Sequence, residues 1–199
     1  NEHYEVLEKI IEMGYAKNIE LRYNSNGIEW EPNLFDLWKE FKNVIMHFSI
    51  DAYGEQNYFI RYPANWKRVV NQLHKMDDYP YDNLRLTTAT CITALNIFYL
   101  PEFITWKLEE DWKILNKFPA GAGMIDLHLA YWPPQLNCKA LPLDFKKIVT
   151  EKYEAFYPWL EKNWHLSGAP NKEAFMINNY TIDRLKGIAS FMNAEDWSV

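Results

Sequence analysis

A hydroxyl, a carboxylate and a guanidinium follow one another closely in the middle of the sequence. Ser49 and Asp51 come at the end of an apolar run, Val44 to Phe48, and Arg61 lies in the helix expected after a short polar turn. In parallel α/β proteins, ligands bind at the carboxyl ends of the strands. A guanidinium binds carboxylates and phosphates through paired hydrogen bonds. These three side chains therefore predict a clamp for an amino acid or a nucleotide.

The same three residues also have a purely structural interpretation. Serine and aspartate side chains near a helix start often bond to the backbone and cap that helix. An arginine on its own often forms only a surface ion pair. We favour the ligand clamp because the hydroxyl, the carboxylate and the guanidinium occur together. For Asn24 and Asn26, which precede Gly27, an ordinary turn is the alternative to a ligand-binding role.

A regular alternation of strands and helices must position these side chains. The expected strands are residues 18–23, 44–50, 84–90 and 124–131; the expected helices are residues 5–13, 34–41, 58–76, 92–112 and 144–164, with one or two more within 170–197 capped by Asn179 or Thr181. Strands that alternate with helices lie parallel and are joined by right-handed crossovers. We therefore predict an α/β fold, a parallel-stranded partial (β/α) barrel of about four strand–helix units, too few to close a barrel. We treat residues 1–199 as a single domain, with the strand–helix units in 1–142 and carboxy-terminal helices in 143–199.

Composition excludes several classes of partner. The formal net charge of the 199-residue chain is −6 and no basic run occurs, which argues against nonspecific nucleic-acid binding. No apolar stretch approaches the roughly 20 residues that span a bilayer, so we expect no membrane segment. The two cysteines, Cys91 and Cys138, form no disulfide framework, which predicts a reducing, cytoplasmic environment.

Motifs of the common enzyme classes do not occur in the sequence. It contains no P-loop, G-x-S-x-G or G-x-G-x-x-G motif, and its histidines lack the close spacing of zinc sites. His128 alternates with apolar residues in an expected strand, so we expect it in the core or in a barrel lumen. A carboxylate-using hydrolase would need two acids that face one cleft. Asp51 and Asp126 are the candidates for such a pair.

Four short motifs, in chain order, resemble those of radical S-adenosylmethionine (SAM) proteins. The first motif, His3-Tyr4-Glu5 with Leu7-Glu8, resembles the helix that follows the Gly-Gly-Glu-Pro strand of that family, and the second, Tyr23-Asn24-Ser25-Asn26, is similar to "YNTN". The third is similar to "SIDG…EYIR…W" and consists of Ser49-Ile50-Asp51-Ala52, Tyr58-Phe59-Ile60-Arg61 and Trp66. The fourth, Leu95-Asn96-Ile97, matches "LNI". The resemblance covers nearly the whole chain. It corresponds to the carboxy-terminal part of radical SAM proteins that carry an amino-terminal twitch domain.

The resemblance implies a partial (β/α)6 barrel in which a CxxxCxxC loop binds a 4Fe–4S iron–sulfur cluster. In the family this cluster cleaves SAM reductively, and the resulting radical abstracts hydrogen from a substrate. The CxxxCxxC loop and the Gly-Gly-Glu-Pro strand are absent from this sequence, which starts at Asn1 without a methionine. We expect Cys91 to be buried rather than ligating, and Cys138 to be a free thiol in a loop. The chain would be inactive alone and would supply one wall of the SAM site, completed by a missing amino-terminal segment of the same protein.

Residue roles follow from the resemblance only where the motifs match. Ser49 and Arg61 would hold the methionine carboxylate of SAM, and Asp51 would orient Arg61 or reach a ribose hydroxyl. Asn26 and Asn96 would offer amide groups to the ribose or adenine. The backbone of residues 129–132 would lie near the adenine. The substrate-facing candidates are His128, Tyr131 and Trp132, which the family motifs do not cover.

A second hypothesis assigns the chain to a different functional class. A half-barrel has an unpaired strand edge, here residues 18–23, and such edges pair with other strands. The chain would then be a stand-alone binding or interaction domain that forms a homodimer through this edge. Neither hypothesis identifies a small-molecule or peptide substrate.

Overall fold

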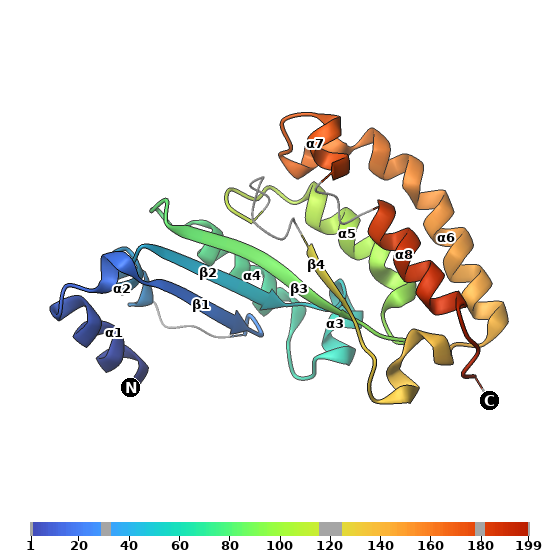
Figure 1. The fold of residues 1–199 in the computed structure, drawn as a ribbon, viewed down its shortest axis with the longest axis horizontal. Helices are drawn as coiled ribbons and strands as arrows, with labels where there is room; N and C mark the ends of the chain where they lie inside the picture. Colours follow the sequence, from blue (N-terminus) through green and yellow to red (C-terminus); the bar gives the residue numbers. More distant parts are fainter. Residues whose placement is uncertain (1, 29–32, 116–124, 178–181, 199) are drawn as a thin grey trace.

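One all-parallel sheet forms the centre of the computed structural model, which describes residues 2–28, 33–115, 125–177 and 182–198. Its strands lie in the order β1 (Glu20–Ser25), β2 (Asn43–Ser49), β3 (Leu84–Ile92) and β4 (Ile125–Leu129), as Figure 1 shows. Each strand pairs with the next one along the chain. The predicted α/β fold with parallel strands is confirmed.

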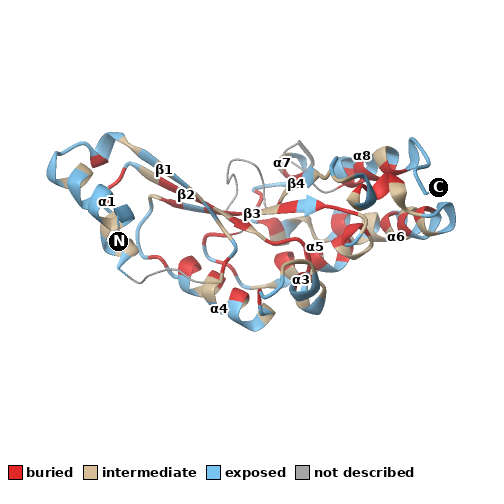
Figure 2. Ribbon diagram, turned by 90° about the horizontal axis from the view of Figure 1, so that it is seen from below, coloured by how far each residue is buried: buried red, intermediate tan, exposed pale blue. Residues whose placement is uncertain are grey.

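Helices follow the strands and cover one side of the sheet. The α-helices are α1 (Glu2–Glu12), α2 (Leu34–Trp38), α3 (Gly54–Ile60), α4 (Trp66–Asp77), α5 (Leu100–Glu109), α6 (Leu143–Lys162), α7 (Lys172–Ile177) and α8 (Ile182–Asn193), and the short 3-10 helices are η1 (Ala16–Asn18), η2 (Ile97–Tyr99), η3 (Pro134–Leu136), η4 (Cys138–Ala140) and η5 (Trp164–Ser167). Figure 2 shows α3, α4 and α5 on the same side of the strands. Helices α6 and α8 pack together beyond β4 (Figure 1). None of the described helices has both the length and the apolar character needed to cross a membrane.

Three prolines occupy different places in the helices: one separates two helices, one lies in a first turn and one lies inside a continuous helix. The helix expected over 58–76 is two helices, α3 and α4, with Pro63 between them. Proline lacks an N–H group and restricts the residue before it, which favours a helix end there. Pro101 instead lies in the first turn of α5, where a missing N–H costs little. Helix α6 continues through Pro158 without splitting. The expected strand start at Met124 and the caps Asn179 and Thr181 lie outside the described residues.

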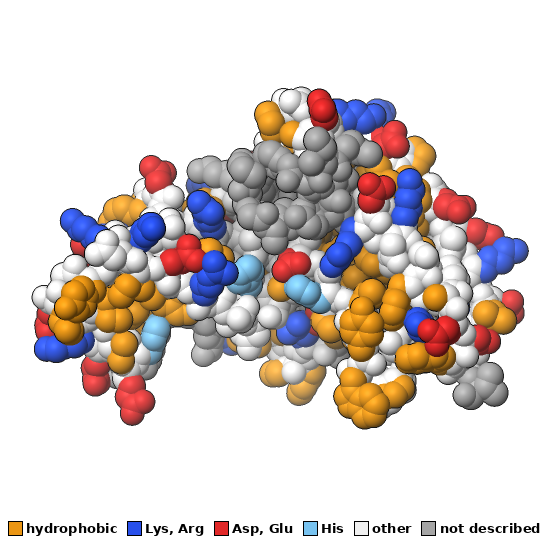
Figure 3. All heavy atoms as spheres, viewed as in Figure 1, with side chains coloured by type: hydrophobic (Ala, Val, Ile, Leu, Met, Phe, Trp, Pro, Cys, Tyr) orange, Lys and Arg blue, Asp and Glu red, His pale blue; other side chains and the backbone are white. Residues whose placement is uncertain are grey.

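The two faces of the sheet differ in polarity. Because successive side chains of a strand point to opposite faces, β2 directs Val44, Met46 and Phe48 into the core beneath the helices. On the other face, which we call the open face, the side chains are mostly polar, and all but the buried Thr87 lie half-buried or exposed. This face carries Arg22, Asn24, His47, Ser49, Arg85, Thr87, Cys91, Asp126 and His128. Figure 3 views it and shows histidine, basic and acidic side chains gathered near its centre.

The two edges of the sheet also differ. At the β4 edge, the Nη2 atom of Arg184 from α8 donates a hydrogen bond of 2.5 Å to the backbone carbonyl of Leu127. At the other edge, β1 pairs only with β2 among the described residues, and none of its residues is buried. An exposed edge of this kind can accept another strand.

A buried lysine and aspartate anchor the segment that follows α5. The Oδ1 atom of Asp77 accepts hydrogen bonds from the backbone N–H groups of Ile114 and Leu115, both at 2.8 Å, and Oδ2 accepts one from Lys113. The ammonium of Lys107, fully buried, donates to the carbonyl of Leu115 at 3.2 Å. Burial lowers the pKa of Lys107 to about 7, although the charge of Asp77 opposes this shift.

We predict that Lys107 makes the stability of the protein rise with pH. An unfolded lysine keeps its proton up to about pH 10, whereas the folded one releases it above about pH 7. Between these values the unfolded state binds more protons, so the free energy of unfolding increases with pH. Urea unfolding at pH 7 and pH 9 should show an increase of about 2 kcal/mol in the wild type. This increase should disappear in Lys107→Met and persist in the exposed control Lys75→Met; the same slope in both variants would contradict the prediction.

Candidate functional site

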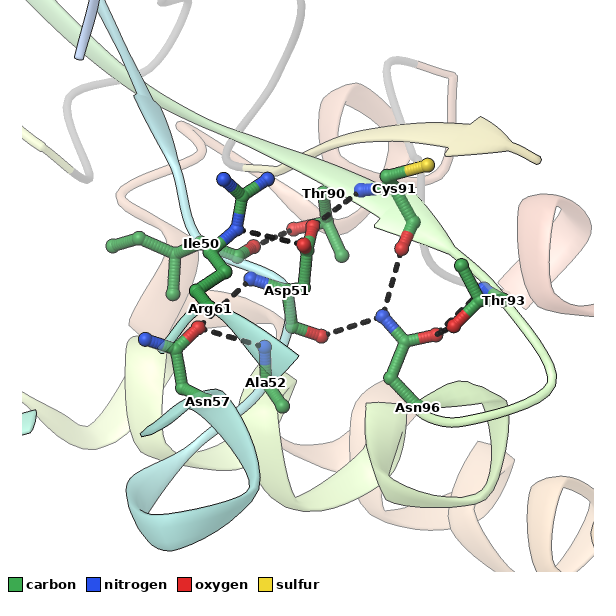
Figure 4. Close-up of polar contacts among 9 residues, drawn as sticks. All are labelled: Ile50, Asp51, Ala52, Asn57, Arg61, Thr90, Cys91, Thr93 and Asn96. Atoms are coloured by element: carbon green, nitrogen blue, oxygen red, sulfur yellow. Dashed lines mark hydrogen bonds and ion pairs between the residues drawn. The ribbon is translucent and has the colours of Figure 1, made fainter. Parts of the chain in front are cut away.

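The side chain of Asp51 joins the carboxyl ends of two strands to α3. It is buried just after β2, and its Oδ1 atom accepts a hydrogen bond of 2.7 Å from the backbone N–H of Cys91 on β3 (Figure 4). Its Oδ2 atom lies 2.7 Å from Nε of Arg61, at the end of α3. The prediction that Asp51 orients Arg61 agrees with this contact.

Asn57 explains how α3 comes to present Arg61 at this point. Its Oδ1 atom accepts hydrogen bonds from the backbone N–H groups of Asp51 at 3.1 Å and Ala52 at 3.4 Å. Gly54 has a φ of 64°, a backbone conformation that glycine adopts readily, and it lets the chain turn from the strand end into the helix. Asn57 is buried, and the sequence analysis did not identify it. An asparagine six residues after a strand-end aspartate was the available signal.

The outer end of the Arg61 guanidinium is not engaged by the described residues. Its contact with Asp51 is an ion pair, because Nε makes no well-directed hydrogen bond there. Figure 4 shows the two terminal nitrogens pointing away from Asp51. The side chain keeps 27% of its surface exposed. The cluster therefore holds a guanidinium whose terminal donors can reach an anionic ligand.

Asn96 ties the ends of β2 and β3 together. We expected it within a helix, but it lies in the turn before η2 and is fully buried. Its Nδ2 atom donates to the carbonyls of Asp51 at 2.7 Å and Cys91 at 2.8 Å. Its Oδ1 atom accepts from the backbone N–H of Thr93 at 2.7 Å and from its hydroxyl at 3.3 Å. Both donors and both lone pairs are thus used, so a contact with SAM would require one of these bonds to open.

Ser49 and Asn26 occupy the ends of two neighbouring strands. Ser49 is the last residue of β2, lies half-buried on the open face, and is in register with Ala89 of β3. Asn26 is exposed just after β1, and its Oδ1 atom accepts a hydrogen bond of 3.1 Å from the backbone N–H of Ile28. Asn26 therefore forms the local turn that was the alternative to ligand binding. The strand itself continues through Ser25, two residues beyond its expected end.

The substrate-facing candidates lie around and beyond the end of β4. His128 is exposed rather than in the core, and its Nε2 atom lies 2.9 Å from Oδ2 of Asp126 on the same strand. His128 is therefore not a core residue; it lies on the open face, opposite the helices, which is the face that would line the lumen of a partial barrel. Tyr131 packs edge-on against Phe191 of α8. His128 and Tyr131 line a cavity of about 480 Å³ with Arg184. Trp132, 80% exposed, does not line it.

The two thiols have opposite surroundings from those expected. Cys91 is exposed on the open face, which corrects the prediction of a buried residue, and Cys138 is buried in η4 rather than lying in a loop. Both are free thiols. Burial raises the pKa of Cys138 to about 11. Partial burial and the nearby charge of Asp51 raise the pKa of Cys91. In the described part of the chain, no group of three or more His, Cys, Asp or Glu side chains is arranged to hold a metal ion.

Comparisons with known proteins identify no relative of this chain. No protein-family model matches it, and searches of curated proteins and of solved structures also gave no match.

We predict that Asn96→Ala destabilises the protein by about 3 kcal/mol. The substitution leaves the buried carbonyls of Asp51 and Cys91 without a donor, and buried unsatisfied groups cost about 1–3 kcal/mol each. Urea unfolding, followed by tryptophan fluorescence, measures the change. Asn71→Ala, at an exposed position of α4, is the control and should change stability by less than about 0.5 kcal/mol. Equal effects of the two substitutions would show that the hydrogen bonds of Asn96 contribute little to the free energy of unfolding.

Proposed function

We propose that this chain is the carboxy-terminal portion of a radical SAM enzyme and contributes one wall of the SAM and substrate site. The observation that carries the proposal is the Arg61 guanidinium, held by Asp51 at the carboxyl end of β2 with its terminal nitrogens directed away from that carboxylate. The motif resemblance supports it. The position also agrees with the general rule that ligands of parallel sheets bind where the strands end.

The residues present fit the amino-acid end of SAM. The terminal nitrogens of Arg61 would bind the methionine carboxylate, and the hydroxyl of Ser49 would donate a further hydrogen bond. Asp51 would keep the guanidinium oriented, because its own position is fixed by the N–H of Cys91. SAM, when bound, would supply the hydrogen-abstracting chemistry that the resemblance implies.

The iron–sulfur cluster has no matching ligand set on this chain. Cys91 and Cys138 are the only cysteines, and one of them is buried. The cluster would therefore be bound by the amino-terminal segment that the proposal requires. A strand from that segment would pair with the exposed edge of β1. The two free thiols support the cytoplasmic location that forms part of the proposal.

The exposed edge of β1 also supports a second candidate function. A binding or interaction domain that pairs β1 with β1 of a second copy would use the same N–H and C=O groups. Its partner would be another protein chain rather than a small molecule.

Calorimetric titration with SAM tests the leading proposal. The protein to use is this chain extended upstream through the CxxxCxxC and Gly-Gly-Glu-Pro segments, with its iron–sulfur cluster reconstituted. We expect Arg61→Ala to weaken SAM binding by about tenfold or more, and Ser49→Ala by about fivefold, because a charged hydrogen bond contributes more than a neutral one. The Arg68→Ala variant, changed at an exposed position of α4, should bind as the wild type does. Absence of SAM binding by the extended protein would rule the proposal out.

Sedimentation of this chain alone tests the second candidate. Pairing through β1 predicts a monomer–dimer equilibrium that depends on protein concentration. A monomer at every concentration up to about 100 µM would exclude a functional homodimer and leave the SAM proposal untouched. A dissociation constant at this limit corresponds to a free energy of association of about −5 to −6 kcal/mol.

A further inference from the structure

A second cleft lies in the helical layer, on the side of the sheet opposite the open face. It has a volume of about 490 Å³ and is bounded by the start of α3 and by α5. Figure 2 shows these two helices on the same side of the strands. The side chains that matter here are two aromatic residues, Tyr53 and Trp106, and three acids, Glu102, Glu109 and Glu110. The SAM proposal uses none of them.

Aromatic rings form the wall of this cleft. The ring centroids of Tyr53 and Trp106 lie 5.9 Å apart, with their planes tilted by 36°. Trp66 packs edge-on against both, at 5.4 Å from Tyr53 and 4.8 Å from Trp106, and so fixes their positions. Tyr53 remains 42% exposed. Both rings line the cleft, and aromatic faces attract cations. Trp106 is also stacked against Phe103, with ring centroids 5.9 Å apart, so the exposed ring of Tyr53 is the more accessible of the two.

Carboxylates flank these rings along α5. Residues at i, i+4 and i+7 share one side of a helix, which places Glu102, Trp106 and Glu109 in a single stripe. The Cα atoms of the two glutamates lie about 10 Å apart along the helix axis, with the tryptophan between them. The lining residues include no lysine or arginine. Glu110 pairs with His74 at 3.1 Å, whereas Glu109 has no ion pair among the described residues.

The chain itself uses this chemistry next to the cleft. The ammonium of Lys152 lies 3.6 Å from the ring centroid of Phe98 and 2.5 Å from Oε1 of Glu102. An alkylammonium thus already occupies a position between an aromatic face and one of the cleft glutamates. Tyr53, Trp106 and Glu109 line the same cleft, so it combines the same two kinds of group.

We propose that this cleft binds a small quaternary alkylammonium ligand. Aromatic faces attract such cations, and a quaternary ammonium is weakly hydrated, so its transfer from water costs less than that of a primary ammonium. Glu109, which has no ion pair among the described residues, adds long-range attraction without needing a direct hydrogen bond. The cleft is a binding site separate from the SAM half-site, and its occupant is recognised by charge and shape.

Titration with choline and with 3,3-dimethyl-1-butanol tests the proposal. The two molecules have nearly the same shape, but only choline is charged. Calorimetry with the full chain should show saturable choline binding and about tenfold weaker binding of the alcohol, in the range of partly desolvated cation–π contacts. Equal affinities, or no saturable choline binding, would overturn the proposal.

Matched variants locate the binding. Glu109→Gln should weaken choline binding by about threefold to tenfold, whereas Glu8→Gln, which removes the same charge from exposed α1, should leave it unchanged. Tyr53→Phe keeps the aromatic face and should retain binding, while Tyr53→Leu should lose about tenfold. These side chains are exposed, so the substitutions should not impair folding. If Glu109→Gln and Glu8→Gln had the same effect, or if Tyr53→Leu bound as well as Tyr53→Phe, choline would not occupy this cleft.

Discussion

The carboxylate and backbone of Asp51 hold together the carboxyl ends of β2 and β3. Its side chain bonds to the N–H of Cys91 and pairs with Arg61, its carbonyl accepts from Asn96, and its N–H donates to Asn57. One residue therefore fixes the position of a neighbouring strand, a helix and a turn. A buried carboxylate with this many partners resists movement, because releasing any of them leaves a charge or a polar group without compensation. The buried part of the candidate site, where Asp51 contacts Nε of Arg61, is therefore rigid, while the terminal nitrogens of Arg61 point away from Asp51.

The polarity of the open face follows from the same arrangement. Parallel sheets are usually covered on both faces and carry apolar residues on both. In this chain, β2 and β3 bury apolar or small side chains towards the helices, while the other face carries arginines, histidines and a thiol. A face of this composition gains little from burial in an ordinary core, because each polar group would need a partner there. A polar ligand would provide such partners, which agrees with the position of the proposed site.

The sequence predicted the parallel sheet correctly because alternation of strands and helices leaves few other topologies. It did not reveal that the described helices cover only one face of β2, since its apolar run resembles that of a strand buried on both. The error at Cys91 has the same origin: its position in the alternation places it on the open face. The division between α3 and α4 was missed because the apolar pattern continues across Pro63. The role of Asn96 depends on a contact with Asp51, which lies 45 residues away in the sequence, although Thr93 three residues before Asn96 is compatible with a local side-chain turn. Asn57 contacts Asp51 only six residues earlier, but the residue types alone do not show that its side chain turns back to the strand end.

The hydrogen bond between Arg184 and the carbonyl of Leu127 makes the two edges of the sheet unequal in their ability to accept another strand. Because Arg184 takes up a carbonyl at the β4 edge, whereas no described residue pairs with the outer edge of β1, a further strand is accommodated more readily beside β1. If that strand comes from another copy and the two β1 strands meet about a two-fold axis, the pair uses both β1 edges and is closed. A guanidinium at the opposite edge thereby disfavours growth beyond such a pair.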